Sequence, residues 1–168
     1  VGFYSAAYKL FEISIIFPTS IMLVLFPTLV AEYHSDHPQF KKSSVKALGI
    51  FSIAGGSLAL ILWGTSREII TIIFGDEFYP SIVVLEVLSG AVFLFFLNFL
   101  LSNILISSGR ETINTWNLVG ATVLNIILNL VFIPQYGAIG AAWSTVFCEA
   151  VLIVVLGLEV RKSVNSNS

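Results

Sequence analysis

Charged side chains are scarce in this chain of 168 residues. Asp, Glu, Lys and Arg make up 11% of it, whereas ordinary soluble domains contain roughly a quarter. The eight Lys and Arg residues form no basic stripe, so the sequence lacks the clustered positive charge that is typical of nucleic-acid-binding proteins. One cysteine and two histidines exclude a disulfide framework and a cluster of Cys and His metal ligands. We therefore expect no nucleic-acid partner, no metal and no other cofactor.

Apolar residues are abundant instead. They make up 57% of the chain, and its mean hydropathy is +0.95. They concentrate in five runs, which cover residues 10–31, 45–64, 81–107, 113–133 and 138–160. Each run is long enough to cross the roughly 30 Å hydrocarbon layer of a bilayer, which takes about 20 helical residues. Since lipid offers backbone groups no hydrogen-bond partners, each run should form a helix.

The sequence therefore predicts an all-α fold, a polytopic transmembrane bundle of five helices within the lipid bilayer. Residues 1–162 form the membrane domain, and residues 163–168 form a polar C-terminal tail. Two basic residues, Lys9 and Arg67, fall on one side of the predicted membrane. Six fall on the other side: Lys41, Lys42, Lys46, Arg110, Arg161 and Lys162. Because Lys and Arg accumulate in short cytoplasmic loops, the second side, which includes the C-terminus, should be cytoplasmic.

Two prolines, Pro18 and Pro27, interrupt the first apolar run. Proline removes a backbone donor and crowds the preceding turn, so both positions are candidates for a kink or hinge. Such kinks either let the helix flex or fit it statically to its neighbours. The polar residues 32–44 follow and include Pro38, a composition that predicts a solvated loop.

Four asparagines lie within the third and fourth apolar runs: Asn98, Asn103, Asn125 and Asn129. Asn125 and Asn129 are four residues apart and therefore share one helix face. Amides are costly against lipid, so these side chains should face other helices or a water-filled cavity. As contacts between helices, each hydrogen bond would contribute about 0.6–2 kcal/mol. As cavity lining, the amides would suit sugar hydroxyls, which makes all four candidates for a substrate cavity.

Glu149 lies about 16 Å along the last predicted helix, close to the bilayer midplane. A charged carboxyl at that depth costs on the order of 2.5–3.5 kcal/mol unless it is protonated, paired or hydrated. One interpretation is a cation- or proton-coupling site, or a polar contact in a transport cavity. The other is a structural carboxyl that is hydrogen-bonded to Asn125 or to a nearby serine.

Four stretches of the chain carry a resemblance to a known family. They are LNLVFIPQYGAIGAAWST at 128–145, VGFYSAAYK at 1–9 with the prolines that follow, IFGDEFY at 73–79, and SGR at 108–110. In order and spacing, they resemble the C-terminal part of prokaryotic polysaccharide-biosynthesis membrane proteins. These are lipid-linked oligosaccharide flippases of the Wzx type. Their superfamily (MOP) also contains multidrug exporters of the MATE type and peptidoglycan-precursor flippases.

The resemblance implies a MATE-like transporter fold, in which two six-helix lobes enclose a cavity that opens alternately to each side. This chain would supply helices eight to twelve, most of the C-terminal lobe, and its partner would be the missing N-terminal lobe. The implied function is not enzymatic. It is export of polyprenyl-pyrophosphate-linked oligosaccharide across the cytoplasmic membrane of a prokaryote. The chain departs from this picture in one respect, because no Arg or Lys lies deep in a predicted helix.

Three other functions are alternatives to the flippase. A MATE-like multidrug or cation antiporter would use Glu149 as its coupling carboxylate. A membrane remnant that does not transport would only pack against partners. A membrane-embedded glycan polymerase or acyltransferase would need acid–base or nucleophilic groups that converge near the interface, and the sequence offers no such cluster.

Overall fold

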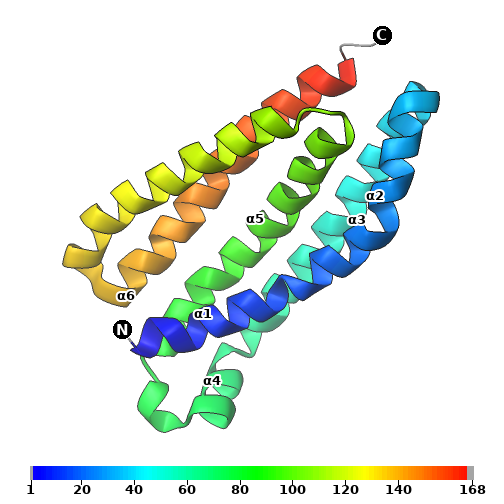
Figure 1. Ribbon diagram of the computed structural model, residues 1–168. Coiled ribbons are helices and arrows are strands. Elements are labelled where there is room, and N and C mark those ends of the chain that lie inside the picture. Colours follow the sequence, from blue (N-terminus) through cyan, green and yellow to red (C-terminus); the bar gives the residue numbers. More distant parts are fainter. Residues whose placement is uncertain (1, 166–168) are drawn as a thin grey trace.

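The computed structural model of the chain describes residues 2–165, and every secondary-structure element in that part is helical (Figure 1). The elements are α1 (Gly2–Ser14), α2 (Ile16–Ser35), α3 (His37–Gly64), α4 (Ser66–Phe74), the 3₁₀ helix η1 (Asp76–Phe78), α5 (Ser81–Ser107) and α6 (Glu111–Asn165). The predicted all-α fold is therefore confirmed for the described residues.

Four helical stretches in the described part are long and apolar enough to cross a membrane: Gly2–Ser35, His37–Gly64, Ser81–Ser107 and Glu111–Val164. The sequence predicts five, and the numbers differ because the last two predicted helices form one element, α6. The bounds of α5 coincide with the prediction, whereas the first two stretches begin earlier than predicted. Residues 163–165, predicted to belong to the polar tail, extend α6. The remaining tail residues, 166–168, lie outside the described part.

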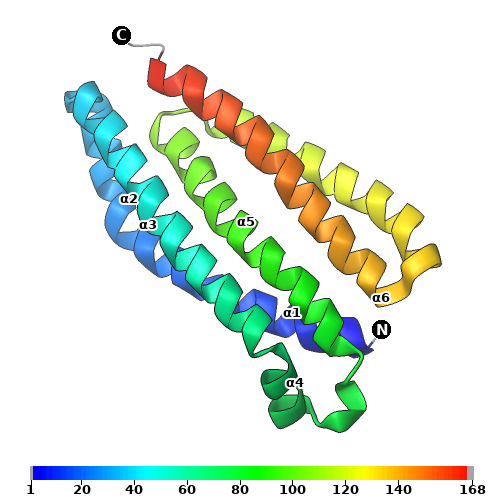
Figure 2. The same ribbon diagram turned by 180° about the vertical axis from the view of Figure 1, so that it is seen from behind.

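The helix α6 folds back on itself at Gly137. This residue has φ 59° and ψ −132°, a positive φ that glycine adopts readily and other residues adopt rarely. The first arm (residues 111–136) and the second arm (residues 138–165) run antiparallel and side by side (Figures 1 and 2). Across the turn, the rings of Phe132 and Phe147 lie 6.0 Å apart between centroids. α6 is thus a helical hairpin, with its turn within the predicted connection 134–137.

The helix α5 occupies the centre of the bundle and packs against α1, α2, α3, α4 and α6. Its side chains Leu88, Phe96 and Leu100 are completely buried. Gly55 of α3 makes a close approach to it, because a Cβ at that position would lie 2.8 Å from Cβ of Phe96. Small residues let neighbouring helices pack closely in membranes, and Gly55 has this function between α3 and α5.

Large apolar side chains cover much of the outer surface. Leu23, Val24, Ile53 and Leu60 each expose at least 70% of their area. So many exposed apolar side chains indicate contact with a membrane or with another protein. The outer faces of α2 and α3 are therefore suited to lipid rather than to water.

The first helical stretch divides into α1 and α2 at Ile15, three residues before Pro18, and the two helices run at an angle to each other (Figure 1). Pro18 has no N–H to donate to the carbonyl of Ser14, and α1 ends at that residue. The hydroxyl of Ser14 donates to the carbonyl of Leu10 at 2.9 Å. Pro27, in contrast, lies inside α2 without ending it. That either proline acts as a hinge stays a prediction.

Connections alternate between the two ends of the bundle (Figures 1 and 2). The start of α1, the helix α4 and the turn at Gly137 lie at one end, whereas the α2–α3 and α5–α6 connections lie with the end of α6 at the other. The loop predicted for residues 32–44 is wrong, because only Asp36 in that stretch is not helical. Oδ1 of Asp36 accepts a hydrogen bond from the backbone N–H of Gln39 at 3.0 Å. Asp36 is thus the N-cap of α3, which follows α2 without a longer loop.

Candidate functional site

A polar cavity of about 390 Å³ lies between α1, α5 and the two arms of α6. Its polar lining comes from α1 and both arms of α6: Tyr4, Tyr8, Thr122, Asn125, Asn129, Thr145 and Glu149. Phe95 of α5 and Leu152 of the second arm add apolar surface. The cavity therefore combines one carboxyl with amides, hydroxyls and aromatic faces.

Glu149 is held by Asn98 of α5. The amide Nδ2 of Asn98 donates to Oε2 of Glu149 at 2.7 Å and to the backbone carbonyl of Glu149 at 2.8 Å. Asn98 exposes only 3% of its area, so this contact lies inside the bundle and fixes the second arm of α6 against α5. The sequence predicts Asn125 or a serine as the structural partner of Glu149. That prediction is wrong, because Asn98 supplies the hydrogen bond.

Asn125 and Asn129 lie on the cavity side of the first arm. Nδ2 of Asn129 donates to Oδ1 of Asn125 at 2.9 Å, as expected for residues four apart on one helix face. Both side chains are half-buried. Oδ1 of Asn129 is buried and has no partner among residues 2–165, so the pair keeps one free acceptor beside the cavity.

Asn103 lies away from this group. Its Nδ2 donates to the carbonyl of Phe99, one turn earlier in α5, at 2.7 Å. It does not line the polar cavity. Three predicted residues, Asn125, Asn129 and Glu149, thus share the cavity, and Asn98 contacts it through Glu149. That any of the five candidates touches a substrate stays a prediction.

The cavity carries no positive side chain among the residues that line it in the described part of the chain. Within that part, no group of three or more His, Cys, Asp or Glu side chains could bind a metal ion. Amides and hydroxyls can both donate to and accept from sugar hydroxyls, and a carboxylate can bind a proton or a cation. The cavity is less suited to a pyrophosphate, which needs cationic or N–H donors.

Sequence reasoning did not identify the tyrosines and threonines of the cavity. Helical spacing could have identified them. Thr122 lines the cavity three residues before Asn125 and therefore shares its helix face. Thr145 stands four residues before Glu149 in the same way, and Tyr4 stands four before Tyr8. A polar residue three or four positions from a candidate is a simple criterion for finding such groups.

Comparison with known proteins places the chain in one family. Residues 3–167 match the family described as "Lipid II flippase MurJ". An uncharacterized membrane protein of Methanocaldococcus jannaschii is 33% identical over 133 residues, which cover 78% of this chain and 26% of that protein. A second relative, from Haloferax volcanii, is named "Probable low-salt glycan biosynthesis flippase Agl15". It is 28% identical over 159 residues, which cover 92% of this chain and 33% of that protein.

No solved structure matches the chain. The chain spans between a quarter and a third of the length of these two curated relatives. Its long apolar helices and these relatives make it a multi-pass membrane protein. Because the family match covers nearly every residue, this chain belongs to the lipid II flippase MurJ family.

Proposed function

We propose that this chain works as most of the C-terminal lobe of a flippase that moves a lipid-linked oligosaccharide across the cytoplasmic membrane of a prokaryote. The observation that carries the proposal is the family match over residues 3–167. The glycan-flippase name of the Haloferax volcanii relative supports a sugar-bearing lipid as the cargo. Within the superfamily, a Wzx-type oligosaccharide flippase is the subgroup we favour.

In this proposal the chain crosses the membrane five times, because the two arms of α6 each form one crossing. Residues 1–162 then form the membrane domain, and the tail from residue 163 lies in the cytoplasm. The arm lengths support this arrangement. At about 1.5 Å per residue, arms of residues 111–136 and 138–165 each extend beyond 35 Å, which exceeds the roughly 30 Å hydrocarbon layer.

The polar cavity would contact the sugar while the lipid chain stays in the bilayer. Asn125 and Asn129 would exchange hydrogen bonds with glycan hydroxyls, and Tyr4 and Tyr8 would offer aromatic faces to the sugar rings. Positively charged side chains of the N-terminal lobe would bind the pyrophosphate, since no residue described as lining this cavity is positively charged. The bend before Pro18 would act as the hinge when the lobes open alternately to each side.

The function can be tested in cells that lack their own flippase for lipid-linked oligosaccharide. The longest reading frame that contains this chain should restore surface glycan, and the 168 residues alone should not. In the longer protein, the double substitution Asn125→Leu and Asn129→Leu should lower glycan export at least tenfold. A matched control, Ile126→Leu and Leu130→Ile, changes exposed side chains of the same arm and should leave export unchanged. Full export by the asparagine variant would contradict the assigned cavity.

The topology can be tested by cysteine labelling in intact cells. In a Cys148→Ala background, a cysteine placed at Gln135 in the α6 turn should react with an impermeant external thiol reagent. A cysteine placed at Ser168 should react only after the cells are permeabilised. External labelling at Ser168 would contradict the proposed orientation, and equal labelling at both positions would contradict the five crossings.

A cation- or proton-coupled antiporter of the MATE type is the second candidate. The specific observation that favours it is Glu149, a carboxyl that lines the cavity and is held by a neutral amide rather than by a cation. Under this alternative, Glu149→Gln in the longer protein should abolish ion-coupled drug efflux, although glutamine preserves the shape and the hydrogen bond. Unchanged efflux would argue against coupling through this residue.

A further inference from the structure

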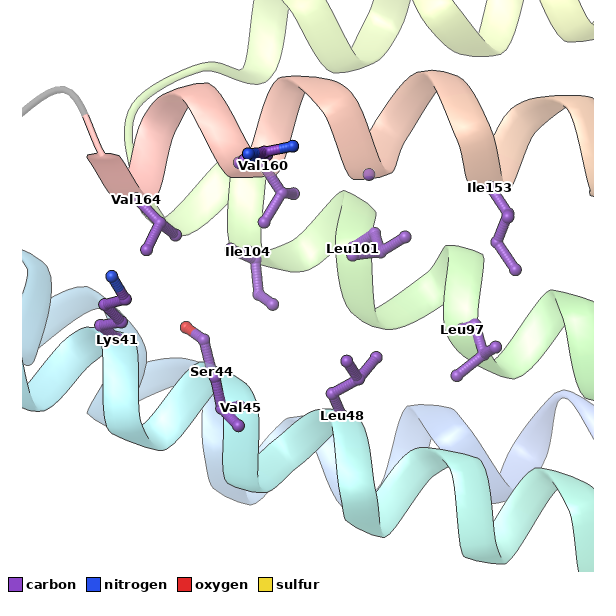
Figure 3. Close-up of a pocket in the computed structure, with 12 residues that line it drawn as sticks. Lys41, Ser44, Val45, Leu48, Leu97, Leu101, Ile104, Ile153, Val160 and Val164 are labelled. Atoms are coloured by element: carbon purple, nitrogen blue, oxygen red, sulfur yellow. The ribbon is translucent and has the colours of Figure 1, made fainter.

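A second, largely apolar groove lies between α3, α5 and the second arm of α6 (Figure 3). Its volume is about 450 Å³, within the roughly 300–1,000 Å³ that small-ligand pockets occupy. On α5 it uses Leu97, Leu101 and Ile104, which are spaced four and three residues apart and so form one stripe. Phe95, which lines the polar cavity, lies on another face of α5. The two sites are therefore separate.

One end of this groove is positively charged. Lys41 of α3 and Arg161 of α6 both line it, and neither forms an ion pair within residues 2–165. Lys41 lies in the second turn of α3 and Arg161 lies four residues before the end of α6, and these two helix ends lie at the same end of the bundle (Figures 1 and 2). At that end, Nε2 of His37 lies 3.1 Å from the carbonyl of Val164, a contact in which the ring donates. Two free cations therefore stand at the entrance of an apolar groove.

A buried hydroxyl faces the groove close to this charged end. Ser44 exposes 6% of its area, and its Oγ has no hydrogen-bond partner among the described residues. Figure 3 shows this oxygen directed toward the space between α3 and the second arm of α6. A buried polar atom without a partner is costly, and this hydroxyl lines the same groove as Lys41 and Arg161, so it indicates a ligand that accepts a hydrogen bond there.

We propose that this groove binds one anionic membrane lipid from the leaflet at that end of the bundle. The lipid phosphate would lie between Lys41 and Arg161, and a phosphate or glycerol oxygen would accept the hydrogen bond of Ser44. One lipid chain would extend past Leu48 and Leu101 toward Ile153. Lys41 and Leu48 are seven residues apart on α3, so the groove leads about 10 Å from charged to apolar surface. This proposal requires that the chain lies in a membrane, but it does not depend on the proposed transport function.

The test is native mass spectrometry of the purified full chain after delipidation in detergent. The probes are palmitoyl-oleoyl phosphatidylglycerol, which is anionic, and the phosphatidylcholine with the same chains, which has no net charge. One molecule of phosphatidylglycerol should remain bound where phosphatidylcholine is lost. The double variant Lys41→Gln and Arg161→Gln should bind phosphatidylglycerol roughly thirtyfold more weakly, at about 1 kcal/mol for each cation at a membrane surface.

The matched control is Lys42→Gln with Lys162→Gln, which removes the same charge from the adjacent positions that do not line the groove. It should bind phosphatidylglycerol within about threefold of the unaltered chain. Ser44→Ala should weaken binding by roughly fivefold. The proposal would be overturned if the two lipids bind equally well, or if the double variant and its control lose the same affinity for phosphatidylglycerol. It would also be overturned if the groove retains neither lipid because another segment covers it. Circular dichroism of every variant identifies any that fail to fold.

Discussion

Two glutamates on the second arm of α6 have opposite kinds of partner. Glu149 accepts a hydrogen bond from the neutral amide of Asn98 at 2.7 Å. Glu159, ten residues later, lies 3.4 Å from Arg110 and 2.6 Å from Lys162. At about 1.5 Å per residue the two carboxyls are roughly 15 Å apart along the helix. One helix therefore carries a deep carboxyl with an uncharged donor and a shallow carboxyl with two cations.

The difference follows from what each depth allows. A Lys or Arg near the centre of a bilayer costs about 2.5–3.5 kcal/mol by itself, and a buried ion pair seldom regains its desolvation cost. An asparagine supplies an N–H donor without a second charge. Near the helix end, water and lipid head groups solvate cations, so Arg110 and Lys162 are tolerated. The pairing of these carboxylates is therefore what the proposed five crossings would require, with Glu149 near the bilayer centre and Glu159 near its surface.

The largest expected effect comes from breaking the deep contact. Asn98→Leu removes both hydrogen bonds to Glu149 and leaves a half-buried carboxyl without a donor, which should lower the free energy of unfolding by about 2–3 kcal/mol. The matched control, Asn103→Leu in the same helix, loses only a hydrogen bond to Phe99 and should cost less than about 1 kcal/mol. Denaturant titration in detergent micelles measures both values.

A second substitution separates the missing contact from simple loss of packing. Asn98→Leu combined with Glu149→Leu removes the orphaned carboxyl and should recover most of the lost stability. If the double variant is as unstable as Asn98→Leu alone, the polar contact does not explain the effect of the single substitution.

A smaller effect is expected at the shallow site. Arg110 also donates from Nη1 to the backbone carbonyl of Glu159 at 3.0 Å, so it closes the α5–α6 connection against the second arm. Arg110→Gln should lower the free energy of unfolding by about 1 kcal/mol. The loss should shrink when salt is raised, because a partly exposed pair is screened. A loss that does not depend on salt would mean that the backbone hydrogen bond, and not the ion pair, stabilises this end.

The smallest effect is expected for Lys162. Its side chain exposes 67% of its area, and such pairs three residues apart on a helix contribute about 0.3–0.5 kcal/mol. Lys162→Gln should therefore shift the melting temperature by about one or two degrees in a scanning fluorescence measurement. A shift as large as that of Asn98→Leu would remove the distinction between the deep and shallow carboxyls.

The sequence predicts the helices better than it predicts their contacts. Apolar length alone locates α5 at residues 81–107, and the gap between the runs 113–133 and 138–160 locates the turn of α6. The pair Asn125 and Asn129 follows from helical spacing. These features depend on neighbours along the chain, so composition and periodicity are sufficient to find them.

The contact between Asn98 and Glu149 could not be predicted in this way. These residues are 51 positions apart, and their meeting depends on how α6 rotates and slides against α5. A run of leucines and valines does not specify that rotation, since helices in lipid pack through shape and not through a difference in hydrophobicity. The start of α1 at Gly2 does not follow from apolar length either, because the small and aromatic residues before Leu10 join the core without forming a continuous apolar run.

The hairpin of α6 has a consequence for how the chain enters the membrane during synthesis. Between Glu111 and Glu149, no Asp, Glu, Lys or Arg occurs, and the turn at Gly137 lies within this stretch. The turn can therefore be carried across the bilayer without moving a formal charge through hydrocarbon. The ring contact between Phe132 and Phe147 already joins the two arms near their tip. In the proposed topology, the two arms would therefore enter the bilayer as one hairpin.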